Sequence, residues 1–174
     1  MDIPQRKQIR LKEYDYSQNN AYFITICTQN RRNLFGEVVY DAVGAHLRVR
    51  PNNPDKLIEK WLFELENKFP GVTVDCYVIM PNHIHFILFC SARAGVCAGA
   101  PLPEIIQWFK AQTTNEYIRG VKTGLYPPFE KHVWQRNYYE HVIRNEEDLF
   151  ETRKYIDENL LKWNEDELNF VFSD

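Results

Sequence analysis

The sequence has no long hydrophobic run and few cysteines, and both absences exclude large classes of protein. No stretch approaches the ~18 apolar residues of a membrane-spanning helix, and the first 20 residues contain no apolar segment that would indicate a signal peptide. The four cysteines include no CxxC pair and are too few for a disulfide framework. We therefore expect a cytoplasmic protein with reduced cysteines and no membrane contact.

Glycine is also scarce, at 7 of 174 residues, and no glycine-rich phosphate-binding motif is present. The patterns GxxxxGK[ST], GxGxxG, GxSxG and HExxH are all missing, which argues against P-loop ATPases, dinucleotide-binding enzymes, α/β-hydrolases and zinc peptidases. Any catalytic chemistry must therefore come from residues outside these motifs.

The charge of the chain is distributed unevenly. Residues 1–139 carry a formal charge of +4 and residues 140–174 carry −7, which together give the net charge of −3. A negative total argues weakly against a nucleic-acid partner, but the mildly basic first part is compatible with a local phosphate-binding surface. A length of 174 residues is typical of one domain with a full hydrophobic core, so we expect a single domain over residues 1–174.

Hydrophobic periodicity predicts a mixture of strands and helices. The expected elements are a strand at 21–29, a helix at 54–69, strands at 72–80 and 84–90, a helix at 104–119, an extended segment at 134–144 and a capped helix from Asn145 to about Trp163, with loops at 91–103 and 120–133. This order predicts an α+β fold of ferredoxin-like or RRM-like type, an antiparallel sheet with helices on one face. RNA-recognition domains share this topology, so the fold alone does not define a function.

His83 and His85 form a His-x-His pair at the start of a strand that is otherwise apolar. Side chains two residues apart on a strand point to the same face, so the two imidazoles, about 7 Å apart at Cα, could share a metal ion. The alternative is a pair of histidines on a solvent-facing surface. Polar side chains in such an apolar strand need a partner, which favours the metal.

Tyr155 and Asn159 are four residues apart on the last expected helix and therefore share one of its faces. An activated tyrosine hydroxyl can attack phosphorus, and the Asn159 carbonyl oxygen can bind a metal. The alternative is a tyrosine that only packs in the core, as tyrosines at helical spacing commonly do.

Basic and aromatic side chains are interleaved in several segments, a pattern suited to single-stranded nucleic acid because bases stack on rings while phosphates need cations. The set comprises Arg6, Lys7, Arg10, Lys12, Arg31, Arg32, Lys110, Arg119, Trp134, Arg136, Tyr138, Tyr139 and Arg144. Solvated surface charges beside a packed aromatic core would give the same composition.

Three segments together resemble the REP-associated tyrosine transposases, which belong to the single-tyrosine HUH transposases. They are YVIMPNHIHFIL at 77–88, WQRNYYEHVIRNEED at 134–148, and Tyr155-Ile156-x-x-Asn159. The likeness extends from the basic arm RKQIRLKE to Trp163. It differs from many relatives in having Leu160 rather than proline after Asn159, and in a Gly/Ala-rich loop at 93–101.

The resemblance implies a metal-dependent enzyme that cleaves and rejoins single-stranded DNA at hairpin, REP-like sequences. His83, His85 and Asn159 would bind Mg²⁺ or Mn²⁺, and Tyr155 would be the nucleophile that forms a 5′-phosphotyrosine. DNA contacts are expected from Arg6, Lys7, Arg10, Lys12, Arg31, Arg32, Arg136 and Arg144. Both monomeric and homodimeric forms are compatible with the sequence. The alternative is a non-enzymatic nucleic-acid-binding module with the same RRM-like topology.

Overall fold

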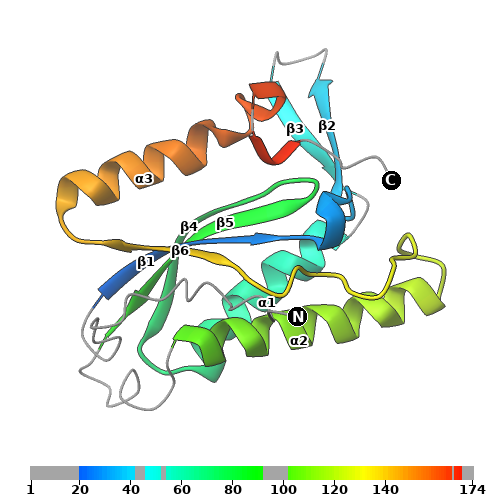
Figure 1. The fold of residues 1–174 in the computed structure, drawn as a ribbon, viewed down its shortest axis with the longest axis horizontal. Coiled ribbons are helices and arrows are strands. Elements are labelled where there is room, and N and C mark those ends of the chain that lie inside the picture. The colour runs from blue at the N-terminus through cyan, green and yellow to red at the C-terminus, as the bar shows by residue number, and fades with distance from the viewer. Residues whose placement is uncertain (1–19, 42–45, 52–53, 92–101, 166, 170–174) are drawn as a thin grey trace, which may run out of the picture.

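The computed structural model describes residues 20–41, 46–51, 54–91, 102–165 and 167–169. A four-stranded antiparallel sheet forms its centre, in the order β4-β5-β1-β6 (Figure 1). The strands are β1 (Asn20–Cys27), β4 (Val72–Ile79), β5 (His83–Cys90) and β6 (Tyr139–Ile143). The expected basic arm at 6–13, with Arg6, Lys7, Arg10 and Lys12, and the loop at 93–101 lie outside the described residues.

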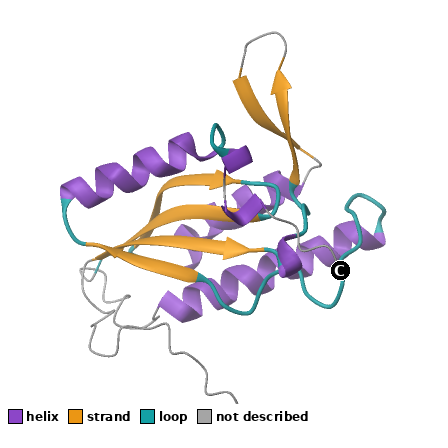
Figure 2. Ribbon diagram, turned by 45° about the horizontal axis from the view of Figure 1, so that its top comes forward, coloured by secondary structure: helices purple, strands orange, loops and turns teal. Residues whose placement is uncertain are grey.

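Two helices connect these strands in the ferredoxin-like order β1, α1, β4, β5, α2, β6. Helix α1 (Pro54–Lys68) and helix α2 (Leu102–Lys122) lie side by side on one face of the sheet (Figures 1 and 2). This confirms the predicted α+β fold class. The third helix, α3 (Glu146–Asn159), lies on the opposite face, so the expectation that all helices share one face is wrong.

Strand β1 is buried on both faces, as its two β-forming faces predict. Tyr22, Ile24 and Ile26 belong to the large core under α1 and α2, while Ala21 and Phe23 pack on the α3 side. Both sides of the strand therefore need apolar residues, and simple alternation of polar and apolar side chains is lost.

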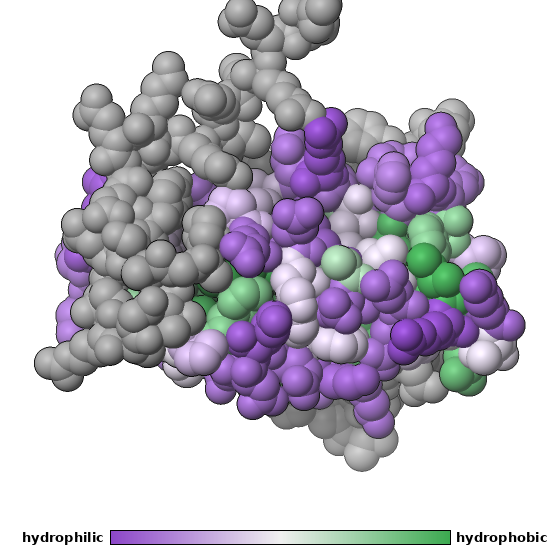
Figure 3. Space-filling view, turned by 90° about the horizontal axis from the view of Figure 1, so that it is seen from below, coloured by the Kyte–Doolittle hydropathy of each residue, from purple (hydrophilic) through white to green (hydrophobic). Residues whose placement is uncertain are grey.

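The outer surface of the α1–α2 layer is mostly hydrophilic, as amphipathic helices require (Figure 3). A more hydrophobic area is visible towards the end of the molecule where α2 terminates. Leu125, which follows α2, is 63% exposed. Within the described residues, no helix combines the length and apolarity needed to cross a membrane.

A second, two-stranded sheet was not predicted. It consists of β2 (Gly36–Asp41) and β3 (His46–Pro51), paired in antiparallel register from Gly36↔Pro51 to Asp41↔His46. The sequence does carry a signal for this hairpin. Residues 46–50, HLRVR, alternate polar and apolar side chains as a strand does, and they follow the β-forming residues EVVY at 37–40.

Several element boundaries also differ from the sequence expectation. Helix α2 is longer than 104–119, and its last turn includes residues that were expected to form a loop. Only residues 139–143 of the segment 134–144 form a strand, while Trp134 makes an isolated bridge to Thr28. Helix α3 ends at Asn159, and the short 3-10 helices η3 (Trp163–Glu165) and η4 (Glu167–Asn169) follow it.

The start of α3 is capped as predicted. The Asn145 side chain accepts a hydrogen bond from the Asp148 backbone nitrogen at 2.8 Å. The Asp148 carboxylate accepts a hydrogen bond from the Arg144 backbone nitrogen at 3.1 Å. In a standard capping box, the donor would be the backbone nitrogen of the cap residue itself, which is Asn145 here.

Candidate active site

His83 and His85 lie at the beginning of β5, a central strand of the sheet. Their neighbours across the β1–β5 ladder are Cys27 and Thr25, respectively. The two imidazole centroids are 4.5 Å apart, and both side chains are almost completely buried on the face covered by α3. The structure thus brings the two rings together as strand alternation predicts.

Asn82 fixes the orientation of His83. The Asn82 amide nitrogen donates to the backbone oxygens of Arg31 and Leu168, so the Asn82 Oδ1 atom must face the histidine. This oxygen accepts a hydrogen bond from His83 Nδ1 at 2.7 Å. With its proton on Nδ1, His83 carries its lone pair on Nε2, the tautomer that an Nε2 metal ligand needs.

His85 is held in a comparable way. Its Nδ1 atom is 2.8 Å from the Thr25 hydroxyl, and its ring stacks on Phe23 at a centroid distance of 5.3 Å. The Nε2 atom of His85 is buried and has no hydrogen-bond partner among the described residues. Such a buried nitrogen is costly unless a ligand completes it.

Both histidines are held in the neutral form. Burial, with smaller effects from His85 and Arg31, lowers the pKa of His83 to about 2. Burial lowers the pKa of His85 to about 3. Neutral imidazole is the form that binds metal ions, so both side chains are in the protonation state that a metal ligand requires.

Helix α3 places Tyr155 against this pair. The Tyr155 ring is 5.3 Å from the His85 ring and 5.8 Å from the Phe23 ring, measured between centroids. The neighbouring Ile156 is buried and anchors the helix on the sheet, whereas Tyr155 remains 44% exposed. A tyrosine that touches a buried histidine while remaining accessible has the arrangement expected of a nucleophile and differs from a simple core residue.

Asn159 lies one helical turn after Tyr155 and is buried, at 4% exposure. Its Oδ1 atom has no hydrogen-bond partner in the described part of the chain. Four residues later, the ring of Trp163 lies 6.0 Å from the ring of His83. Tyr155 therefore contacts His85, Trp163 lies beside His83, and Asn159 is midway between these two residues in the sequence.

The donor set can be tested against the expected divalent cation. The described residues contain no cluster of three His, Cys, Asp or Glu side chains that could hold a metal. Two neutral imidazole nitrogens and one amide oxygen are nevertheless ligands that suit Mn²⁺, and Mg²⁺ if water fills the other positions. The buried His85 Nε2 and Asn159 Oδ1 atoms, which have no hydrogen-bond partner among the described residues, fit such an ion.

The predicted DNA-binding arginines are not all near the histidines. Arg31, in the 3-10 helix η1 (Gln29–Arg31), is close enough to influence His83, and Arg32 forms an ion pair with Glu130 at 3.4 Å. Arg136 is exposed just after the bridge at Trp134. Arg144 follows β6 at the opposite end of the sheet from His83, so the structure does not bring it to this centre.

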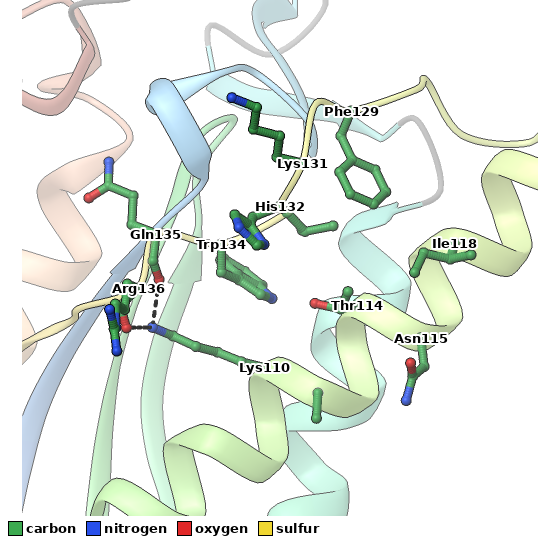
Figure 4. A pocket seen from close by; sticks show the side chains of 12 residues that line it. Lys110, Thr114, Asn115, Ile118, Phe129, Lys131, His132, Trp134, Gln135 and Arg136 are labelled. Carbon is green, nitrogen blue, oxygen red and sulfur yellow. Dashed lines mark hydrogen bonds between the residues drawn. The ribbon is translucent and has the colours of Figure 1, made fainter.

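Lys110 is a structural residue. Its ammonium group donates to the backbone oxygens of Gln135, Arg136 and Asn137 at 2.9, 3.3 and 3.0 Å. Burial lowers the pKa of Lys110 to about 8. All three N–H donors of the ammonium group are used in these bonds. The expectation that Lys110 suits nucleic acid is therefore corrected: the side chain holds the backbone of residues 135–137 against α2 (Figure 4).

Sequence reasoning missed four supporting residues, Phe23, Thr25, Asn82 and Trp163. Only Asn82 carried a signal, because it lies in the Pro-Asn turn directly before His83. The other three approach the histidines through strand pairing or after α3 and have no local pattern.

The fold and this polar centre define a ferredoxin-like protein. On the α3 side of its sheet, it carries a buried histidine pair and a helix with an accessible tyrosine. A sequence model described as "Transposase IS200 like" matches residues 16–159, so the chain belongs to the IS200-like transposase family. The resemblance to tyrosine transposases is confirmed at this level.

Two further comparisons agree with this assignment. A Haemophilus influenzae protein described as uncharacterized is 33% identical over 175 residues, covering 95% of this chain and 94% of its own. A solved REP-associated tyrosine transposase, bound to a REP hairpin, has a TM-score of 0.57 at 20% identity, covering 87% of this chain and 74% of its own. This second likeness supports the fold.

Proposed function

We propose that this transposase is a metal-dependent endonuclease that cleaves and rejoins single-stranded DNA through Tyr155. The observation that carries the proposal is the contact between the accessible Tyr155 ring and the buried His85 ring, at 5.3 Å between centroids. A binding module would have no need for this juxtaposition. The hairpin bound by the solved relative supports hairpin, REP-like DNA as the substrate.

His83, His85 and Asn159 are the proposed holders of Mg²⁺ or Mn²⁺. When bound there, a divalent cation would polarise a phosphate oxygen and stabilise the charge that develops during attack. The chain's own contribution is orientation: Asn82 and Thr25 hold the two imidazoles with their Nδ1 atoms engaged.

Tyr155 would carry out the covalent step. Its hydroxyl oxygen attacks phosphorus and loses its proton, while the bond to the 3′-oxygen breaks and that oxygen takes up a proton. The product is a 5′-phosphotyrosine and a free 3′-hydroxyl. Because one phosphoester replaces another, a second 3′-hydroxyl can reverse the step and join a new strand without ATP.

The test is covalent capture. Wild-type protein and Tyr155→Phe would be incubated with single-stranded oligonucleotides that contain hairpins, in Mn²⁺, Mg²⁺ or EDTA, and resolved on a denaturing gel. We expect an adduct only with wild-type protein and metal. Tyr139→Phe is the matched control, because Tyr139 is 55% exposed and contacts the same Phe23 ring at 6.3 Å.

The control variant should keep the adduct. An adduct that survives in Tyr155→Phe but disappears in Tyr139→Phe would move the nucleophile to Tyr139. Binding of hairpin DNA with no adduct under any metal condition would instead favour the non-enzymatic binding module.

A further inference from the structure

Phe23 lies at the centre of a group of aromatic rings beside the histidine pair. It belongs to β1, the strand next to β5, and its side chain is on the α3 face of the sheet. Its ring stacks on the His85 ring at a centroid distance of 5.3 Å and an interplanar angle of 23°. The Tyr155 ring contacts it edge-on, at 5.8 Å and 87°. One apolar side chain therefore touches both a proposed metal ligand and the proposed nucleophile.

These three rings contact one another in pairs. The His85 and Tyr155 rings are themselves 5.3 Å apart, at an angle of 67°. Stacked and edge-to-face contacts are directional, so a ring with two such neighbours has fewer favourable orientations than a ring with one. The contact with Phe23 thus restricts the angle at which the Tyr155 ring lies against His85.

Helix α3 fixes the backbone of Tyr155 better than its side chain. The next residue, Ile156, is buried in the same apolar cluster as Phe23. Tyr155 itself is 44% exposed. An accessible tyrosine on a helix can exchange between the χ1 rotamers near 180° and −60°. Ring contacts on its inner side are what favour one rotamer over the other.

A phenylalanine can influence the reaction only through its neighbours. Its side chain has no polar atom, so it cannot take the proton of the Tyr155 hydroxyl or occupy a coordination position of a metal ion. His85 has a second restraint from the same strand, because its Nδ1 atom is 2.8 Å from the Thr25 hydroxyl. A change at Phe23 should therefore disturb the placement of Tyr155 more than that of His85.

Tyr139 provides an internal comparison. It is 55% exposed, and its ring is 6.3 Å from the Phe23 ring at an angle of 69°. The ring contacts found for His85 within the described residues do not include Tyr139. Contact with both Phe23 and His85 therefore distinguishes Tyr155 from the other accessible tyrosine beside Phe23.

We infer that Phe23 is a positioning residue, whose ring holds the Tyr155 ring against His85 in the arrangement from which the hydroxyl attacks phosphorus. The attack rests on the proposed function, whereas the placement of Tyr155 can be measured without DNA. A small displacement of a reacting group lowers the rate of a chemical step strongly. Loss of the Phe23 ring should therefore slow the covalent step and leave binding of DNA and metal intact.

The experiment compares three substitutions of Phe23 in the full-length protein. Phe23→Leu removes the ring, Phe23→Met replaces it with an unbranched side chain that adapts to irregular space, and Phe23→Tyr keeps a ring. Ile143→Ala is the control, because it removes apolar volume from the same cluster at the position where β6 pairs with Ala21. Urea denaturation measures the stability of every variant.

Two kinds of measurement separate positioning from folding and binding. The rate of adduct formation on a hairpin oligonucleotide is followed over a range of DNA concentrations, which separates kcat from KM, and Mn²⁺ affinity is measured by calorimetry without DNA. In parallel, 3-fluorotyrosine is incorporated at position 155, and its fluorine NMR signal is recorded in DNA-free protein. The neighbouring rings shift this signal, so it reports the placement of Tyr155 directly.

We expect Phe23→Leu and Phe23→Met to lower kcat about tenfold or more, with KM and Mn²⁺ affinity changed less than about twofold. Their fluorine signals should move towards that of 3-fluorotyrosine in an unfolded peptide. Phe23→Tyr should recover most of the rate, and Ile143→Ala should keep both the rate and the signal. If Phe23→Leu does not fold, Phe23→Met decides by the same criteria.

Two results would overturn the inference. One is a wild-type rate and an unmoved fluorine signal in the variants that lack the ring. The other is an equal loss of rate in Ile143→Ala at a comparable loss of stability, because the effect of Phe23 would then be purely structural.

The outcomes also separate this inference from the proposed function. Absence of any adduct from wild-type protein, with Mn²⁺ or Mg²⁺, would refute the proposed function. A fluorine signal that still moves in Phe23→Leu and Phe23→Met, but not in Ile143→Ala, would then show that the placement of Tyr155 by Phe23 stands without the reaction. An unmoved signal would refute both.

Discussion

The two faces of the central sheet are built in different ways. The face under α1 and α2 is a continuous hydrophobic core that includes Tyr22, Ile58, Leu62, Phe86 and Phe109, all fully buried. The face under α3 has a much smaller apolar cluster. It comprises Ala21, Phe23, Ile87, Ile143 and Ile156, with a few partly buried neighbours.

Polar residues fill the space that apolar residues would occupy on the α3 side. His83, His85 and Asn159 are as buried as core residues, and α3 itself buries only Ile156 and Asn159. Besides Ile156, two polar pairs connect the helix to the sheet, Arg153 with Asp75 on β4 and Asp148 with His141 on β6.

The two faces therefore contribute differently: one supplies most of the folding free energy, and the other carries the proposed catalytic residues. Removing apolar surface from water is the main source of folding free energy, and it is concentrated on the α1–α2 side. On the α3 side, the His85 Nε2 and Asn159 Oδ1 atoms have no hydrogen-bond partner among the described residues, and Tyr155 stays accessible. Buried polar groups of this kind, at the proposed functional centre, are tolerated because the opposite face supplies the stability.

The strongest test of this division is removal of the buried histidines. We expect His83→Ala or His85→Ala to abolish adduct formation while changing the free energy of unfolding by no more than about 1–2 kcal/mol, since removal of a polar imidazole from a buried position offsets part of the cost of the cavity left behind. Covalent capture and urea denaturation would measure the two effects.

The same variants test the metal site independently of cleavage. Mn²⁺ at 100 times its dissociation constant should stabilise wild-type protein by about 2.7 kcal/mol and leave His85→Ala unchanged. If both alanine variants cut DNA at the wild-type rate, the metal assignment is wrong.

A matched pair of core substitutions compares the two faces directly. Ile58 and Ile156 are both buried, at 0% and 1% exposure. We expect Ile58→Ala to cost about 4 kcal/mol and Ile156→Ala about 2 kcal/mol, because Ile156 belongs to the much smaller of the two apolar clusters. Urea denaturation measures both. Equal losses of unfolding free energy in the two variants would contradict the view that the α1–α2 face contributes more stability than the α3 face.

Much of this organisation follows from the sequence. The spacing of Leu57, Ile58 and Leu62 predicts α1 and its buried side, and the two β-forming faces of residues 21–29 predict a strand buried on both sides. The His83-x-His85 spacing on a strand predicts two rings on one face, as found. These features depend on local periodicity, which a single sequence contains.

Features that depend on tertiary contacts could not be predicted. Helix α3 packs on its side of the sheet through a small apolar cluster that joins Ile156 to Phe23 and Ile87, residues far apart in the sequence. The bracing role of Lys110 depends on three carbonyl groups about 25 residues away, which no local motif reveals.

A smaller effect is expected from the ion pair that holds α3 to β4. Two Arg153 nitrogens, Nε and Nη2, donate to the Asp75 carboxylate, each at 2.7 Å. The pair is partly exposed, so Arg153→Met should cost only about 1 kcal/mol of global stability. Lys154→Met is the control, an exposed cation on the same helix, and should cost close to nothing.

The same variant should reduce adduct yield more than it reduces global stability, because it loosens the helix that carries Tyr155. Hydrogen exchange of the α3 amides would report this loosening directly. Unchanged exchange and unchanged adduct yield in Arg153→Met would show that α3 does not depend on the ion pair.

The smallest effect should come from the pair at the other end of α3. His141 Nε2 is 3.0 Å from both Asp148 carboxylate oxygens. Partial burial disfavours the ionised carboxylate, but hydrogen bonds from His141 and from the Arg144 backbone nitrogen outweigh this and hold the pKa of Asp148 below its ordinary value of 3.8. Because the unfolded chain binds a proton more readily, the stabilisation is present above the ordinary pKa and is lost as pH falls through the lower, folded one.

Asp148→Asn should therefore cost less than about 1 kcal/mol at pH 7, and its difference from wild-type protein should shrink towards pH 3. Other carboxylates titrate in the same range, so the comparison uses Glu147→Gln, an exposed acid in the same first turn, to subtract the helix-dipole contribution common to both positions. Urea denaturation at pH 7, 5 and 3 measures all three proteins. A difference that grows as pH falls would have the opposite sign from a stabilised carboxylate, and α3 would then be held at its first turn by the Asn145 cap alone.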